Sequence, residues 1–86
     1  MKYELTLLLP EKEEVKSVKD ILLSEKAKIE KEEEWGQKTL AYPIKKHERA
    51  FYFLWSIDMD DKRISEVKKK LTFNEKLLRY LLLKKD

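Results

Sequence analysis

The order in which strand and helix periodicities follow one another is the feature that most constrains the fold of this 86-residue chain. Six segments carry one of the two periodicities, in the order strand, helix, strand, strand, helix, strand. They cover about residues 2–9, 10–25, 28–44, 51–57, 60–71 and 77–83. Two split βαβ halves of this kind predict an α+β fold, the ferredoxin-like sandwich (βαββαβ), with a four-stranded antiparallel sheet and two helices on one face. We expect residues 1–86 to form a single domain of this type.

Several residues mark the ends of the predicted elements. Pro10 ends the first strand and is expected to open the first helix, where a missing N–H costs nothing. Gly36 is the only glycine and predicts a bulge, while Pro43 predicts an edge strand because it cannot donate to a ladder. Residues 45–49 are expected to form a polar turn. Asp60 is expected to cap the second helix.

The third and the last predicted strands are apolar on both faces. In the last strand, alternation is expected to place Leu78, Tyr80 and Leu82 on one face and Arg79, Leu81 and Leu83 on the other. Two helices can cover only one face of such a sheet. The second apolar face therefore predicts a lid, a dimer mate or a protein partner.

The composition excludes several classes of function. The chain has no cysteine and a single glycine, which excludes thiolate chemistry and the glycine-rich nucleotide loops. His47 is the only histidine and lies in a polar turn, so we expect an exposed side chain, no metal site and no catalytic dyad. The apolar run from Leu5 to Leu9 is far too short to span a membrane. Because the strand pattern already begins at Tyr3, we expect no signal peptide. We expect a cytoplasmic protein that is not an enzyme and carries no cofactor.

Charge is distributed unevenly along the sequence. The net charge is +3, but residues 10–34 carry nine acidic and six basic side chains, whereas residues 35–86 carry thirteen basic and seven acidic ones. A polarised charge of this kind favours a basic surface that faces an anionic partner, with an ordinary solvated surface as the alternative.

Basic residues gather near two of the predicted strands. The two groups are Lys38, Lys45, Lys46 and Arg49 around a hairpin, and Lys76, Arg79, Lys84 and Lys85 along or beside the last strand. Lysine and arginine near aromatic strands suit phosphate contacts. Glutamates gather at residues 30–34, and we interpret them as a charged edge strand that discourages aggregation. An acidic patch that faces a basic protein partner is the alternative.

Two segments resemble a known family. Residues 35–44, WGQKTLAYPI, resemble the W-G-x-[RK]-x-L-A-Y-P-I signature of bacterial small-subunit ribosomal protein six. Residues 73–84, FNEKLLRYLLLK, resemble the last segment of that family, and the opening Tyr3-Glu4-Leu5 resembles its start. The resemblance implies a ferredoxin-like fold and binding to the central domain of small-subunit ribosomal RNA, as a heterodimer with small-subunit ribosomal protein eighteen.

The resemblance also implies site residues. Together with the basic clusters, it predicts RNA contacts at Lys2, Tyr3, Lys38, Lys45, Lys46, Arg49, Arg79 and Lys84. It predicts contacts with the protein partner at Glu33, Glu34, Trp35, Lys38, Leu81 and Leu83. The chain departs from the family pattern around Lys26, which replaces a usual glycine before the second strand, and at Thr39, where a second adjacent base is common.

Two other functions are open to a chain with this fold. A stand-alone RNA-recognition module would stack bases on the open sheet, and Phe51, Phe53 and Trp55 loosely resemble its aromatic strand, although the glycines of that signature are missing. An acylphosphatase-like hydrolase would need a phosphate-cradling loop after the first strand. Residues 9–13 are acidic there and would repel phosphate.

Overall fold

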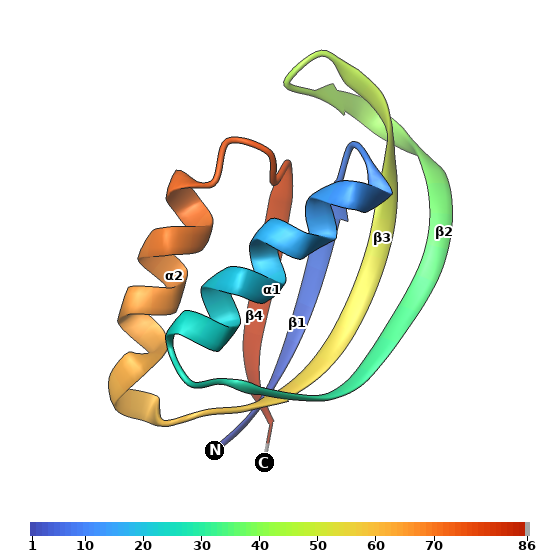
Figure 1. Cartoon of the computed structure of the whole chain (residues 1–86). Coiled ribbons are helices and arrows are strands. Elements are labelled where there is room, and N and C mark those ends of the chain that lie inside the picture. The colour runs from blue at the N-terminus through green and yellow to red at the C-terminus, as the bar shows by residue number, and fades with distance from the viewer. Residues whose placement is uncertain (86) are drawn as a thin grey trace.

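The computed structural model describes residues 1–85 and has the predicted order of elements. The sheet contains the strands β1 (Lys2–Leu9), β2 (Lys28–Ile44), β3 (His47–Asp58) and β4 (Arg79–Lys85). The helices are α1 (Val15–Ser24) and α2 (Ile64–Phe73), each preceded by a 3-10 turn, η1 (Lys12–Glu14) and η2 (Asp61–Arg63). The strand order is β2-β3-β1-β4, every neighbouring pair is antiparallel, and both helices cover the same face (Figure 1). The ferredoxin-like sandwich is confirmed.

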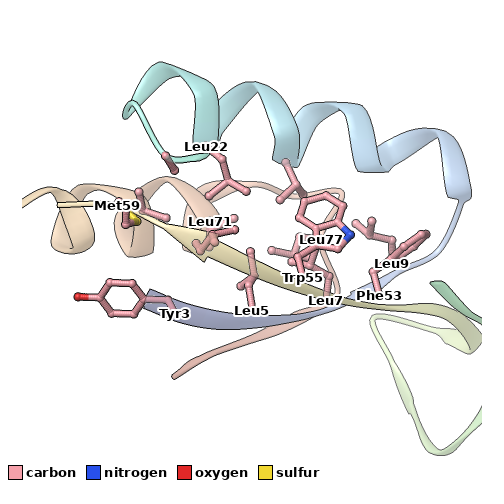
Figure 2. Close-up of a cluster of buried hydrophobic side chains, with 14 residues drawn as sticks. Tyr3, Leu5, Leu7, Leu9, Leu22, Phe53, Trp55, Met59, Leu71 and Leu77 are labelled. Atoms are coloured by element: carbon pink, nitrogen blue, oxygen red, sulfur yellow. The ribbon is translucent and has the colours of Figure 1, made fainter. Parts of the chain in front are cut away.

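The main core lies between this covered face and the helices. Alternating residues of β1 point into it, and Leu5, Leu7 and Leu9 are fully buried. Trp55 and Ile57 of β3 lie beside them, and Val18, Leu22, Val67 and Leu71 close the core from the two helices (Figure 2). Within residues 1–85, no helix is long and apolar enough to cross a membrane.

The first helix begins later than the sequence predicts. Pro10 lies in a bend, and the backbone of Glu11 is extended, with φ −134° and ψ 144°. Residues 10–14 offer no buried side chain to the sheet, so packing does not favour a helix until Val15 begins the apolar stripe. The expectation that Pro10 opens the helix is therefore wrong, although Pro10 does end β1.

The turn and strand ends after residue 44 also differ from the prediction. The polar turn comprises Lys45 and Lys46 alone, because His47 already pairs with Ile44. Both lysines have positive φ, 49° and 69°, the pattern of the tight hairpin turn called type I′. Asp60 caps η2, the 3-10 turn that precedes the second helix, by accepting a hydrogen bond from the backbone N–H of Lys62, whereas α2 itself begins at Ile64 with no side-chain cap.

The last strand covers residues 79–85 rather than 77–83. A turn precedes it, in which the backbone N–H of Leu77 donates to the carbonyl oxygen of Asn74. The strand alternation does not extend through this turn. Leu77 packs in the main core and Leu78 packs on the opposite face, so the expectation that Leu78 shares a face with Tyr80 is wrong.

β2 is an edge strand with irregular pairing, as Gly36 and Pro43 predict. The register shifts between Glu34 and Gly36, where Gly36 has φ 81°. A larger irregularity lies near the hairpin turn: between its pairs with β3 at Thr39 and Ile44, β2 carries four residues where β3 carries one. This wide bulge, residues 40–43, is the local feature that shapes the site described below.

Candidate nucleic-acid interface

The face of the sheet away from the helices is uncovered within residues 1–85 (Figure 1). Strand register arranges its side chains in rows that run across the sheet, in the order β2, β3, β1, β4. The three rows are Gly36–Tyr52–Leu8–Arg79, Glu33–Leu54–Thr6–Leu81 and Lys31–Ser56–Glu4–Leu83. The first row lies nearest the β2–β3 hairpin, and the third lies nearest the chain termini.

A small second core holds the hairpin end against this open face. Leu8, Ala50 and Leu78 are its buried residues, and Leu40 and Ile44 pack against them. Beside this cluster the wide bulge encloses a hollow of about 280 Å³. Its lining residues are Leu8, Leu40, Ala41, Tyr42, Pro43, Ile44, Tyr52 and Arg79.

The structure brings most of the predicted RNA-binding residues to the hairpin end. Lys38 lies opposite Ala50 and therefore on the open side, and Arg79 lines the hollow. Lys46 and Arg49 line a shallow depression beside Pro10, around the tip of the hairpin. The bases thus surround the hairpin end instead of forming one flat patch.

These bases have no acidic partner in the described part of the chain. No ion pair within residues 1–85 involves Lys38, Lys45, Lys46, Arg49 or Arg79. The ammonium group of Lys45 instead donates to the backbone carbonyl oxygen of Leu77, at 3.3 Å. The other four side chains are exposed and keep their charge available for a partner.

Two predicted RNA-binding residues at the opposite end of the sheet are tied to the fold. Lys2 Nζ lies 2.6 Å from Glu30 Oε1 and 3.2 Å from Asp58 Oδ2, and these contacts, the Glu30 hydrogen bond foremost, raise the pKa of Lys2. Lys84 Nζ lies 3.2 Å from Asp61 Oδ2. The charge of each lysine is thus already balanced by an acid.

Tyr3 is placed in the core rather than on an RNA-facing surface. Its side chain is 5% exposed, and its hydroxyl donates to the carboxylate of Asp61 (Figure 2 shows the ring position). This hydrogen bond, more than the accompanying burial, raises the pKa of Tyr3 to about 12. Since the ring has no free face for a base, we leave Tyr3 out of the proposed RNA surface.

The predicted partner residues fall into two groups at opposite edges of the sheet. Glu33 and Leu81 form the two ends of one row, with Leu54 and Thr6 between them. Three strand spacings separate these ends, about 14 Å. A protein that contacts both must therefore lie across the open face. Trp35, 56% exposed, lies at the bulge beside Gly36.

Glu34 does not share the open side with Glu33. It pairs with Phe53 of the covered face, and its carboxylate lies 3.3 Å from Lys12 Nζ. Its neighbours on the acidic edge are paired too, Glu32 with Lys19 at 2.7 Å. The glutamates of β2 are therefore balanced by lysines of η1, α1, β1 and β2 itself, a pairing that the sequence did not reveal.

The aromatic residues expected for a stand-alone RNA-recognition module lie on the wrong face. Phe53 and Trp55 are buried beneath the helices, 6.3 Å apart between ring centroids, and Phe51 packs against the same core. The registers of β1 and β2 place all three opposite covered-face residues. The suggested stacking strand is therefore part of the core, and this alternative loses the residues that supported it.

Tyr42 and Tyr52 were not singled out from the sequence, yet both line the hollow. Tyr42 is 82% exposed in the wide bulge. Pro43 indicated an irregular edge, but the number of extra residues in β2 depends on the pairing of two strands. No group of three or more potential metal ligands occurs within residues 1–85, and His47 is exposed, as expected.

Comparisons with known proteins agree with this architecture. A crystal structure of the 30S ribosomal protein S6 from Thermotoga maritima has the same fold, with a TM-score of 0.83 at 23% sequence identity, covering 98% of this chain and 86% of that chain. The small ribosomal subunit protein bS6 of Fusobacterium nucleatum is 40% identical over 72 residues, which cover 84% of this chain and 77% of that protein.

A second relative extends the match along the chain. The small ribosomal subunit protein bS6 of Vesicomyosocius okutanii is 34% identical over 90 residues, covering 98% of this chain and 80% of that protein. The model of the family described as Ribosomal protein S6 matches residues 2–84. The chain therefore belongs to the ribosomal protein S6 family, as its WGQKTLAYPI segment indicated.

Proposed function

We propose that this small-subunit ribosomal protein binds the central domain of small-subunit ribosomal RNA together with small-subunit ribosomal protein eighteen. The observation that carries the proposal is the hairpin end, where exposed basic side chains without acidic partners border an uncovered apolar sheet face. Because the chain belongs to a family of ribosomal proteins, ribosomal RNA is the polyanion that we propose for this surface.

The RNA-binding half of the proposal rests on four side chains. Lys38, Lys46, Arg49 and Arg79 are exposed and form no ion pair within residues 1–85. Each can neutralise a phosphate and release counterions, which makes affinity depend on salt. If all four make such contacts, the logarithm of the association constant should fall with the logarithm of salt concentration at a slope of roughly −3 to −4.

The protein-binding half rests on the middle of the open face. Leu81 and Leu83 are each 53% exposed, and the half-buried Leu54 lies in the same row as Leu81. Charged groups rim these leucines, Glu33 at one edge and the Glu4–Lys85 pair near the termini. An apolar centre with a polar rim is the usual anatomy of a protein interface.

The two halves share a border on β4. Arg79 and Leu81 point to the same side of that strand and lie in neighbouring rows. A protein seated over Leu81 would therefore lie beside the RNA that contacts Arg79. We infer that the two proteins present one composite surface, so that each partner strengthens the binding of the other to RNA.

Family membership also bears on enzymatic activity and on location in the cell. Ribosomal proteins of this family are structural components of the subunit, so the chain is not an enzyme, in agreement with the sequence-based expectation. A bacterial small-subunit protein lies with the ribosome in the cytoplasm, which is the location the sequence suggested.

The proposal is tested by binding to a transcribed central-domain fragment of small-subunit ribosomal RNA at several salt concentrations, with and without protein eighteen. We expect weak binding by the chain alone, tight binding with the partner and a salt slope of roughly −3 to −4. A slope near zero, or no effect of protein eighteen, contradicts the proposal.

A single substitution assigns the role of Arg79. We expect Arg79→Ala to weaken RNA binding and to reduce the magnitude of the salt slope by about 1, because one phosphate contact is lost. Its thermal unfolding should match that of the wild-type chain, since the side chain is exposed and has no ion pair within residues 1–85. Unchanged affinity rejects the role assigned to Arg79.

A further inference from the structure

We infer that the hollow beneath the hairpin end holds one unstacked nucleobase of the bound RNA, stacked on Tyr42 and contacted by Arg79. This inference rests on the proposed RNA-binding function and deepens it. It adds a pocket for a single base to a surface that otherwise contacts phosphates.

The size of the hollow suits a small flat ligand. At about 280 Å³ it lies just below the range of roughly 300–1,000 Å³ that is typical of pockets for drug-sized molecules. A base unstacked from its neighbours is a smaller ligand than such molecules. A folded segment of a partner protein would not fit.

The walls of the hollow carry the chemistry that recognises a base. Leu8 and Ile44 supply apolar contact, and Tyr42 supplies an aromatic face that is 82% exposed. Proteins bind the bases of single-stranded RNA by stacking them on aromatic rings and on the planar guanidinium group of arginine. Both kinds of stacking group, the ring of Tyr42 and the guanidinium group of Arg79, line the same hollow.

Electrostatics favours a base over an apolar side chain of the protein partner. Arg79 has no ion pair within residues 1–85, so an apolar group that covered it would desolvate an uncompensated charge. Residues 38–49, the hairpin segment that supplies one wall of the hollow, carry four bases and a single acid, Glu48, and Lys38 among them lies on the open side of the sheet. The phosphates on either side of an inserted base would meet this positive surface.

Packing within the chain holds the walls of the hollow in place. The bulge that makes one wall is held at both ends, because Leu40 and Ile44 pack on the buried cluster beneath the hairpin. Pro43 restricts the backbone between them, and the ammonium group of Lys45 ties the turn to Leu77. Preorganisation of this kind lowers the entropy lost on binding.

Stacking and phosphate contact differ in their response to salt, which allows a direct test. We would measure the Kd of the chain, with protein eighteen, for the central-domain RNA fragment at several salt concentrations. Tyr42→Ala should weaken binding by roughly 5- to 150-fold, the range for loss of one stacked base, and leave the salt slope unchanged. Tyr42→Phe keeps the ring and should bind as the wild-type chain does.

The matched control is Phe73→Ala, which removes another exposed aromatic ring, 74% exposed, from α2 in the helical layer. It should leave RNA affinity unchanged. All three variants should unfold thermally as the wild-type chain does, because both rings are largely exposed.

Changes in the RNA identify which base occupies the hollow. Single unpaired nucleotides of the fragment are replaced one at a time by abasic residues, and the effect is measured with wild-type chain and with Tyr42→Ala. One abasic position should weaken wild-type binding and have no further effect on the variant, since both changes remove the same contact.

Three outcomes overturn the inference while the proposed function stands. They are unchanged affinity in Tyr42→Ala, a salt slope that falls with the affinity, and a loss confined to the affinity for protein eighteen measured without RNA. The last outcome assigns the hollow to a side chain of the partner protein. Absence of RNA binding by the wild-type chain contradicts the proposed function and the inference together.

Discussion

The two ends of the sheet use the same kinds of residue in opposite ways. At the end with the chain termini, Lys2 lies against Glu30 and Asp58, and Lys84 lies against Asp61. At the hairpin end, Lys38 and Arg79 form no ion pair within residues 1–85 (Figure 1 shows the two ends). Basic residues near strands are therefore not equivalent candidates for RNA contact.

The difference lies in where the acids fall in space. Glu30 of β2 and the aspartates that end β3 and open η2 lie at the terminal end, where they balance Lys2 and Lys84. The hairpin end is far from them along β2 and β3, and Glu48 forms no ion pair within residues 1–85. We propose that charge at the terminal end serves the fold and that charge at the hairpin end serves a partner.

The largest expected effect comes from removing the unpaired charge. A triple variant with Lys38→Gln, Lys46→Gln and Arg49→Gln should bind the central-domain RNA about 100-fold more weakly at moderate salt and reduce the magnitude of the salt slope by about 2 to 3, because three phosphate contacts are lost. Filter binding or fluorescence anisotropy across a salt series measures both quantities.

The matched control neutralises the other end of the sheet. A double variant with Lys2→Gln and Lys84→Gln should keep the wild-type salt slope and should unfold at a lower temperature, because Glu30 loses its partner and Asp58 and Asp61 each lose one of two partners. Equal losses of RNA affinity in the two variants would erase the distinction between the ends.

A second, smaller effect should appear at high pH and only at the terminal end. The neutral hydroxyl of Tyr3 donates to Asp61, and this contact raises the pKa of Tyr3 from 10.0 to about 12. Because the folded-state pKa is the higher one, this contribution to stability is complete below pH 10.0 and is lost as the pH rises toward about 12. The free energy of unfolding of the wild-type chain should decline across that window.

Tyr3→Phe isolates the contribution of the hydroxyl. The difference in unfolding free energy between wild type and Tyr3→Phe, measured by denaturant titration at several pH values, should shrink between pH 10.0 and about 12. A constant difference for Tyr3→Phe would mean that the hydrogen bond to Asp61 does not control the titration.

The smallest expected effects concern two lysines in the left-handed backbone region, one at each end of the sheet. Lys26 has φ 59° and Lys46 has φ 69°, values that favour glycine. Lys26→Gly and Lys46→Gly should each stabilise the chain by about 0.5–1 kcal/mol, because relief of the backbone conformation outweighs the added freedom of the unfolded chain. Chemical denaturation measures both.

RNA binding should separate these two glycine variants. Lys26→Gly should leave the affinity for the central-domain fragment unchanged, whereas Lys46→Gly should weaken it and reduce the magnitude of the salt slope by about 1. A similar effect on RNA binding in both variants would argue against a specific role for the hairpin end.

Local sequence was sufficient for the order of elements and for several backbone features. The alternating residues of β1 and the apolar stripes of both helices predicted the sandwich, and the structure confirms it. Gly36 predicted a bulge, Pro43 predicted an edge strand, and the absence of the usual glycine around Lys26 coincides with a positive φ there. These features depend on the conformations available to a few neighbouring residues.

Tertiary structure alone decided which predicted site residues are available. Lys2 and Glu30 are 28 residues apart in sequence, and Tyr3 and Asp61 are 58 apart, so neither contact can be read from local pattern. The hollow likewise depends on the pairing of β2 with β3 and on where β4 begins relative to β1. The pairing of strands that are distant in sequence determines which basic side chains lie beside an acidic one. Ion pairs and burial depend on separation in space rather than in sequence.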